Sequence, residues 1–158
     1  KNTDLNVLSV KESIKKANIK FSDIPLDDKS TYDLFKNGNL DGVFQFESQG
    51  MKKFISNLKP ENINDLVAAV ALFRPGPMEN IDTYVKRRHN LQKISYINED
   101  LKDILSSTCG IIVYQEQIMQ IARKMAGFSY AKADELRRAM SKKKEDLLLS
   151  YKDDFIWL

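Results

Sequence analysis

The residues best suited to chemistry lie in one basic segment, LRRAMSKKK at 136–144, which holds five basic side chains and no acidic one. We expect a helix over 129–141, and its apolar stripe consists of Ser129, Ala133, Leu136 and Met140. Arg138 and Lys142 then fall on the opposite face, with Arg137 on the flank. Guanidinium groups bind phosphate oxygens through paired hydrogen bonds and lysines add charge, so this face fits a triphosphate or a nucleic-acid backbone.

The same pattern has a second interpretation, in which the arginines only form ion pairs on the helix surface. Asp134 lies four residues before Arg138, and Glu135 lies three before it. Such pairs stabilise a helix by about 0.3–0.5 kcal/mol each. The helical pattern alone does not decide between the two interpretations.

The distribution of charge also points to the second half of the chain. Residues 1–80 carry 11 basic and 11 acidic side chains, whereas residues 81–158 carry 14 and 11, and the net charge is +3. A smaller basic group, KRRH, occupies 86–89. Polyanions are natural partners of such patches. Composition alone favours the alternative, a solvated helix face.

Other types of active site find little support in the sequence. One cysteine, Cys109, and one histidine, His89, exclude a Cys/His zinc site, and no helix start activates Cys109. Phosphate-binding loops, GxSxG and HExxH motifs and DxD pairs are absent. The adjacent pairs Asp27–Asp28 and Asp153–Asp154 are interpreted as caps or surface charge. We therefore expect no complete active site and no bound metal in this chain.

Two further groups have a functional and a structural interpretation. Helix 114–126 presents Tyr114, Ile118, Ile121 and Met125 along one apolar face. Gln117 and Lys124 lie opposite, where they either reach a polar ligand or, as we favour, belong to a solvated face. In GVFQF (42–46), Phe44 and Phe46 share one side of an extended segment. They either stack on bases or, as we favour, pack in the core.

The elements that position these residues are mainly helical. We expect a second helix that starts at Asp27 or Asp28 and stops at Gly38, and a fourth that starts at Asn62 or Asn64 and runs to 73. The other expected helices cover 3–18, 48–59, 79–88, 99–107, 114–126, 129–141 and 144–157. Within 65–73, an almost wholly apolar stretch, Leu66, Val70 and Phe73 should be buried. Only GVFQF and GIIVY (110–114) read as extended, either as short strands or as entry turns of helices.

Length and composition agree with a folded domain. The chain has 158 residues, 42% of them hydrophobic and 30% charged, with only six glycines and four prolines. One domain is expected from this length, and the composition excludes low-complexity disorder. No stretch has the ~20 apolar residues of a membrane span, and the beginning lacks a signal-peptide core. We expect a cytoplasmic protein that does not contact a membrane.

Four segments, in this order, resemble the alpha subunit of bacterial DNA polymerase III, the C-family replicative polymerase. They are IPLDDKSTYDLFKNGNLDGVFQFESQGMK (24–52), DLVAAVALFRPGPMENIDTYVKRR (65–88), GIIVYQEQIMQIA (110–122) and LRRAMSKKK (136–144). The form of the first segment is similar to the shorter, DnaE-like branch rather than to the PolC branch. Since such subunits contain ~1,000 residues in several domains, the resemblance implies that this chain is a fragment.

The resemblance implies a place within the polymerase. Residues 1–20 correspond to the connection from palm to fingers, and residues 21–158 to the N-terminal part of the fingers domain. The implied fold is a mainly α, helical fingers-domain fragment with at most two short β segments. The last catalytic aspartate of the family precedes this stretch in a D-x-L-G-L motif, and Asp4 lacks the following Leu-Gly-Leu. We assign no catalytic residue here, and the fragment alone should not polymerise.

The resemblance also implies roles for particular residues. Arg137 and Arg138 match the LRRAM motif, whose arginines face the triphosphate of the incoming dNTP, and Arg74 of RPGP matches a further family motif. The basic residues Lys142, Lys143 and Lys144 are expected to contact primer-template DNA. The parent reaction is nucleotidyl transfer with two Mg²⁺ ions held by palm carboxylates outside this chain. Implied further partners of the parent are the sliding clamp and other replisome subunits.

One departure and two rival functions remain. Cys109 stands where the family commonly has an aromatic residue before Gly110, and we expect this to affect local packing. The first rival is a free-standing helical module that binds the DNA backbone, with strong salt dependence and little response to nucleotides. The second is a protein-interaction scaffold that binds neither. Neither rival requires the RPGP and YQEQ segments.

Overall fold

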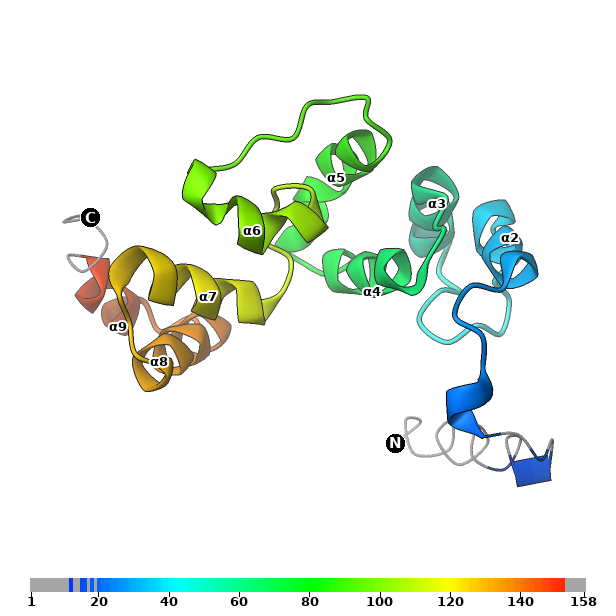
Figure 1. The fold of residues 1–158 in the computed structure, drawn as a ribbon, viewed down its shortest axis with the longest axis horizontal. Helices are drawn as coiled ribbons and strands as arrows, with labels where there is room; N and C mark the ends of the chain where they lie inside the picture. Colours follow the sequence, from blue (N-terminus) through cyan, green and yellow to red (C-terminus); the bar gives the residue numbers. More distant parts are fainter. Residues whose placement is uncertain (1–11, 13–14, 17, 19, 153–158) are drawn as a thin grey trace.

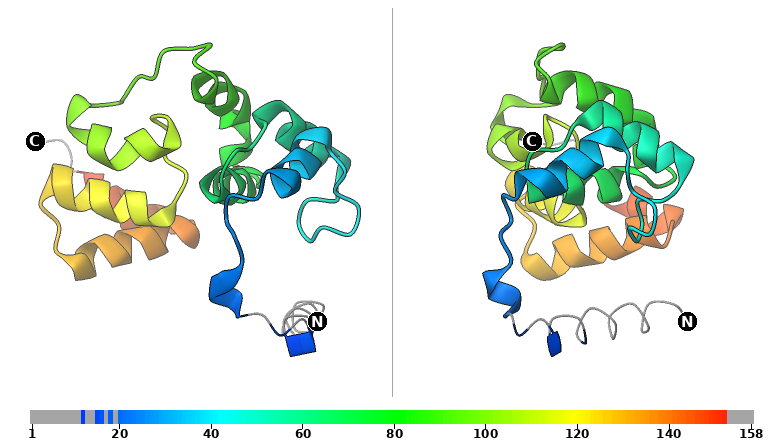
Figure 2. Two further views of the ribbon diagram at one scale, coloured as in Figure 1. Left: turned by 45° about the vertical axis from the view of Figure 1, so that its right-hand side comes forward. Right: turned by 90° about the vertical axis from the view of Figure 1, so that its right-hand side faces the viewer.

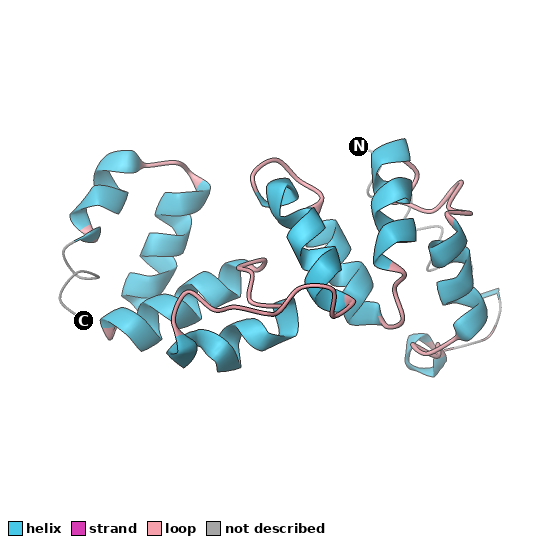
Figure 3. Cartoon of the chain, turned by 90° about the horizontal axis from the view of Figure 1, so that it is seen from above, coloured by secondary structure: helices cyan, strands magenta, loops and turns pink. Residues whose placement is uncertain are grey.

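A row of short helices makes up the protein, as Figures 1 and 2 show. The computed structural model describes residues 12, 15, 16, 18 and 20–152. The α-helices are α2 (Lys29–Asn37), α3 (Gln49–Leu58), α4 (Ile63–Leu72), α5 (Ile81–Arg88), α6 (Lys102–Leu105), α7 (Gln115–Ala126), α8 (Tyr130–Ser141) and α9 (Glu145–Ser150). Single 3₁₀ turns are η1 (Phe21–Asp23), η2 (Pro77–Asn80), η3 (Glu99–Leu101) and η4 (Ser106–Thr108). This described part contains no strand (Figure 3), which confirms the mainly α fold.

Helix boundaries follow the capping residues of the sequence. The side chain of each N-cap accepts a hydrogen bond from the backbone N–H three residues on, at Asp28, Ser48, Asn62 and Ser129. The structure thus has Asp28 rather than Asp27, and Asn62 rather than Asn64, as the helix starts. Gly38 ends α2 and Gly127 ends α7, both in the left-handed conformation that glycine adopts without strain. The separation of α7 and α8 at Gly127 is therefore as predicted.

The two segments with extended character serve as entries to helices, one of the two predicted alternatives. GVFQF folds into successive turns before α3, with Gln45 at a φ of 68°. Phe46 is buried and meets Phe35 edge to face at 5.1 Å, as expected of a core residue. The core prediction is wrong for Phe44, which is 55% exposed. The turns break the period-2 alternation, so the two phenylalanines do not share a face.

Other predicted helices differ from the structure in detail. The segment expected as one helix over 99–107 is a succession of η3, α6 and η4. The segment over 79–88 consists of η2 followed by α5, in which Tyr84 is buried, while Ile81 and Val85 pack against the core as partly buried residues. Of the segment predicted over 144–157, α9 covers Glu145–Ser150, and residues 153–157 lie outside the described residues. The helix expected over 3–18, Asp4 and the pair Asp153–Asp154 lie wholly or almost wholly outside the described residues.

Two clusters of buried apolar side chains hold the helices together. The first core cluster joins α2–α5 to residues 109–113, and includes Leu40, Phe54, Ile55, Leu58, Leu72, Tyr84, Cys109, Ile111 and Val113. The second core cluster lies among α7, α8 and α9, and consists of Ala122, Phe128, Ala133, Leu136 and Tyr151. In Figure 1, α7–α9 lie at one end of the row and α2 and α3 at the other. In the described residues, no helix is long and apolar enough to cross a bilayer.

Helix α4 is less completely buried than its apolar sequence predicts. Leu66 and Leu72 are buried, but Val70 and Phe73 are only partly buried and Val67 is 49% exposed. The expectation of full burial for Val70 and Phe73 is therefore wrong. Helix α4 packs against neighbours on part of its surface, because the first core cluster does not surround it.

Gly110 illustrates how closely the segment before α7 is packed. Its φ is +78°, and an added Cβ would lie 2.4 Å from the carbonyl oxygen of Ser95. We expect Gly110→Ala to lower the free energy of unfolding by about 2 kcal/mol or more, because both backbone strain and a backbone clash oppose it. Denaturant unfolding measures the effect.

Gly127→Ala is the matched control for this substitution. Gly127 has a similar φ of +62°, and an added Cβ would meet nothing within 4 Å. This change should cost only about 1 kcal/mol, from the left-handed backbone alone. Equal effects of the two substitutions would contradict the clash at Gly110.

Candidate functional site

The guanidinium group of Arg137 is held by two helices. Its Nε and Nη2 donate to Oδ1 of Asp134 at 2.9 and 2.7 Å, within α8. Its Nη1 donates to Oε1 of Gln115 at 2.9 Å, from the beginning of α7. The side chain is 26% exposed. Arg137 is therefore fixed in orientation while one edge of it remains accessible.

Arg138 lies on the next position of the same helix and is far more accessible. Its side chain is 66% exposed, and its Nη2 pairs with Oδ2 of Asp134 at 2.7 Å. Asp134 thus bridges both arginines, and the ion pairs of the second interpretation do form, with Asp134 as the acidic partner. The hydrogen bond from Arg137 holds the pKa of Asp134 below its ordinary value, helped by the charge of both arginines. The ionised trio carries one net positive charge.

The lysines that follow extend this positive surface. Lys142, Lys143 and Lys144 are all exposed and form the turn between α8 and α9. Lys143 adopts a φ of 50°, which turns the chain back at the end of α8. Cations at a helix C-terminus also interact favourably with the helix dipole, so these lysines have a structural role as well.

The apolar stripe of α8 differs slightly from the prediction. Ala133 and Leu136 are buried as expected, but Met140 is 44% exposed and Ala139 is buried in its place. Helix α8 packs against both α7 and α9, which brings Ala139 to the interface. The exposed face with Arg138 and Lys142 is as predicted.

Arg74 reaches the segment before α7 from the turn that follows α4. It is exposed at the RPGP turn, and its Nη2 donates to the carbonyl oxygen of Val113 at 3.3 Å. Arg137 contacts Gln115, two residues further on. The beginning of α7 therefore brings Arg74 and Arg137, 63 positions apart in the sequence, to a common three-residue segment.

Gln117 is a structural residue rather than part of a solvated face, so the interpretation favoured from the sequence is wrong. Its side chain is buried, and Oε1 accepts hydrogen bonds from the backbone N–H groups of Val113 and Tyr114 at 2.8 and 2.9 Å. Its Nε2 donates to the carbonyl of Ile104 and to Oγ1 of Thr108. A glutamine at the third helical position is one half of a capping box, but Tyr114 at the N-cap hides the signal. The buried amide of Gln117 thus makes two hydrogen bonds through its oxygen and two through its nitrogen.

Lys124, the other residue predicted on that face, is exposed as expected. Its Nζ pairs with Oδ1 of Asp103 at 2.7 Å. This pair connects α7 to α6 and lies at a surface. The structure does not bring Lys124 together with the arginines of α8 through any contact among the described residues.

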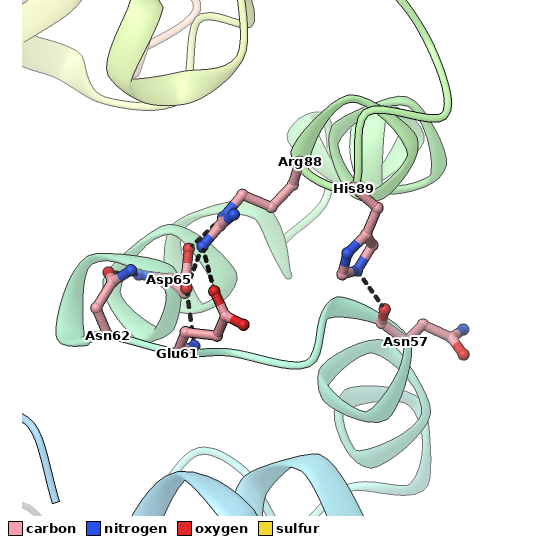
Figure 4. Close-up of polar contacts among 6 residues, drawn as sticks. All are labelled: Asn57, Glu61, Asn62, Asp65, Arg88 and His89. Atoms are coloured by element: carbon pink, nitrogen blue, oxygen red, sulfur yellow. Dashed lines mark hydrogen bonds and ion pairs between the residues drawn. The ribbon is translucent and has the colours of Figure 1, made fainter. Parts of the chain in front are cut away.

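Three of the four residues of the basic group KRRH make internal contacts, whereas Lys86 is exposed, so the group is not simply a solvated face. Arg88 donates to both carboxylate oxygens of Asp65 at 2.9 and 3.1 Å and lies 3.4 Å from Glu61, as Figure 4 shows. Nε2 of His89 is 3.0 Å from the carbonyl oxygen of Asn57. Burial tends to raise the pKa of Asp65, but hydrogen bonds from Arg88 and from Glu61 N–H outweigh it and lower the pKa.

Arg87 joins the segment before α7 to α5. Its Nη1 donates to the carbonyl of Cys109 at 2.9 Å, and its Nη2 donates to Oγ of Ser95 at 2.8 Å. Cys109 itself is buried in the first core cluster, and this burial raises the pKa of its thiol. A buried thiol of raised pKa is a poor nucleophile, which argues against a catalytic pair of Cys109 and His89, the cysteine chemistry that the sequence left open but did not favour.

The comparison with known protein families covers almost the whole chain. Residues 5–157 match the bacterial DNA polymerase III alpha subunit finger domain. The chain belongs to this family. The resemblance found in the sequence motifs is thereby confirmed, and the helices described above constitute a finger-domain segment.

Curated relatives with the name DNA polymerase III subunit alpha agree with this assignment. The protein from Staphylococcus epidermidis strain RP62A is 50% identical over 150 residues, which is 95% of this chain and 14% of the relative. That from Staphylococcus aureus strain Mu50 is 50% identical over 139 residues, which is 88% of this chain and 13% of the relative. The finger-domain chain thus spans about one seventh of the length of these relatives.

Proposed function

We propose that this finger-domain chain is part of a replicative DNA polymerase and binds the triphosphate of the incoming dNTP through Arg137 and Arg138. The observation that carries the proposal is that adjacent positions on α8 present one guanidinium group held in place, that of Arg137, and one that is exposed, that of Arg138. Three of the five N–H donors of Arg137 are engaged, which leaves two for phosphate oxygens. Paired donors of this kind match the geometry of phosphate.

Positioning and charge neutralisation are the chemistry that these residues supply. Arg137 holds the triphosphate so that its α-phosphorus lies in line with the primer 3′-hydroxyl. Arg138 exchanges Oδ2 of Asp134 for a phosphate oxygen and offsets the negative charge that develops on pyrophosphate. Arg74, at the same end of α7, adds a further positive charge toward the phosphates.

The remaining parts of the reaction lie outside this chain in our proposal. In the full-length polymerase, palm carboxylates outside this chain would hold two Mg²⁺ ions, which would supply activation of the primer hydroxyl and stabilisation of the leaving group. In the described residues no three carboxylate, histidine or cysteine side chains converge as metal ligands. We propose residues 1–20 as the connection to the palm and 21–158 as the N-terminal part of the fingers. The sliding clamp and other replisome subunits are proposed partners of the cytoplasmic parent.

The lysines at the end of α8 provide the test that separates this proposal from a free-standing module that binds the DNA backbone. Replacing Lys142, Lys143 and Lys144 by Gln in the full-length polymerase should weaken primer-template binding and lower the salt slope by up to about 3. The nucleotide KM should stay within about twofold of the parent value, because in this proposal the three lysines attract the phosphate backbone of the DNA and do not contact the triphosphate. DNA titrations at two salt concentrations and steady-state kinetics measure both quantities.

Arg138→Ala is the paired variant in the same assays. It should reduce kcat/KM for the nucleotide by about tenfold or more and leave the affinity for DNA within about twofold. The proposal fails if Arg138→Ala weakens DNA binding as the lysine variant does and leaves nucleotide kinetics unchanged. That result would favour the DNA-backbone module.

A further inference from the structure

Gln115, the first residue of α7, is bound to α8 at both ends of its side-chain amide. Oε1 accepts a hydrogen bond from Nη1 of Arg137 at 2.9 Å, and Nε2 donates to Oγ of Ser141 at 3.2 Å. The hydroxyl of Ser141 donates in turn to the backbone carbonyl of Arg137 at 3.0 Å. Because one end of the amide only accepts and the other only donates, these contacts fix its orientation.

The contact with Gln115 completes the restraint of the Arg137 guanidinium. Asp134 binds Nε and Nη2 from the same helix, and Gln115 binds Nη1 from a different one. An arginine side chain has many rotamers, and a ligand that orders them must offset the lost entropy. Because Asp134 and Gln115 hold the guanidinium group from two directions, most of this side-chain entropy is already lost before a ligand binds.

We propose that Gln115 is a positioning residue that holds the Arg137 guanidinium in the orientation in which it meets the nucleotide triphosphate. This inference rests on the proposed function of Arg137. Donors that are already oriented stabilise a transition state without reorganisation, whereas a displaced donor loses much of its effect. Arg138 has Asp134 as its partner and is 66% exposed, so the described residues give it no comparable restraint from a second helix.

The test is Gln115→Met in the full-length polymerase, because methionine keeps the length of the side chain and removes the acceptor. We expect kcat/KM for the incoming nucleotide to fall about tenfold, mainly through kcat, with the Kd for primer-template DNA within about twofold. Gln120→Met is the matched control, since Gln120 is exposed on the same helix. This control should keep kcat and KM within about twofold of the parent.

A double-mutant cycle with Arg137→Ala separates positioning from simple packing of α7 on α8. If Gln115 acts through Arg137, then Gln115→Met changes kcat/KM by less than about twofold in the Arg137→Ala background. An equal loss in both backgrounds overturns the inference, because the effect then does not pass through Arg137. Normal kcat/KM for Gln115→Met also overturns it.

The same cycle shows whether the proposed function itself has failed. Suppose that kcat/KM falls clearly in Arg137→Ala, and that Gln115→Met either has no effect in the parent background or lowers kcat/KM equally in both backgrounds. That result contradicts only the positioning role. Normal nucleotide kinetics in Arg137→Ala contradict the role of Arg137 at the triphosphate, and the inference falls with it. Active-site titration of each variant shows that kcat is calculated per folded enzyme.

Discussion

Replacing Arg137 and Arg138 together by alanine in the full-length polymerase is expected to lower kcat for nucleotide addition by a few orders of magnitude. Each lost charge-assisted contact costs about 1.5–3 kcal/mol, and a factor of ten in rate corresponds to about 1.4 kcal/mol. The loss falls on kcat because charge on the transferring phosphates is greatest in the transition state. Single-turnover kinetics with saturating nucleotide measure the effect directly.

The affinity for DNA provides the contrast in this experiment. Binding of the duplex is spread over many basic groups, so the Kd for primer-template should change far less than kcat. Arg123→Ala is a suitable control, since Arg123 is exposed on α7 and its guanidinium stacks on the Tyr130 ring at 4.2 Å. A double variant with normal kcat and weakened DNA binding would assign the arginines to the nucleic-acid backbone.

Arg88→Ala is expected to lower the free energy of unfolding of the chain by about 3 kcal/mol. The change leaves the carboxylate of Asp65, whose side chain is only 6% exposed, without its charged partner. Removing one member of a buried pair costs more than the pair itself contributes, because the remaining charge is desolvated. Denaturant unfolding at neutral pH measures the difference.

The control and the pH dependence both follow from the same ion-pair network. Glu61→Gln removes the exposed arm of the network, where the charged atoms are 3.4 Å apart, and should cost less than about 1 kcal/mol. Because the pKa of Asp65 is lowered in the folded chain, its stabilisation is complete above the unfolded value of 3.8 and is lost as the pH falls through the folded pKa. The difference in the free energy of unfolding between the parent and Arg88→Ala should therefore become smaller at acid pH. If this difference does not depend on pH, the loss of stability comes mainly from lost packing of the Arg88 side chain.

Local rules predicted the boundaries of most helices. The helix starts at Asp28, Ser48 and Asn62 depend on a hydrogen bond from a backbone N–H only three residues further on. The end of α7 depends on the left-handed backbone conformation of Gly127 itself. Such signals are contained within one turn of the chain. For the same reason the accessible face of α8, with Arg138, could be predicted from helical spacing.

The partners of the polar residues could not be predicted in this way. Arg88 reaches Asp65 across 23 positions, and Arg137 reaches Gln115 across 22. The sequence shows a basic cluster at 86–89, but only the structure shows that Arg88 is ion-paired with Asp65 and Glu61 and that Arg87 binds the carbonyl of Cys109. The role of Gln117 was missed because its four contacts come from residues brought together by α6, η4 and the entry of α7.

The buried amide of Gln117 has a consequence for how the protein opens. Val113 belongs to the first core cluster, whereas α7 contributes residues to the second. Gln117 lies on α7, and its side chain accepts a hydrogen bond from the backbone N–H of Val113, so it connects the two clusters. Moving α7 away from residues 104–114 would leave its amide and several buried backbone groups unpaired, at a cost of about 1–3 kcal/mol for each. We therefore expect partial unfolding of one cluster to disrupt these hydrogen bonds as well, so that the two clusters unfold together.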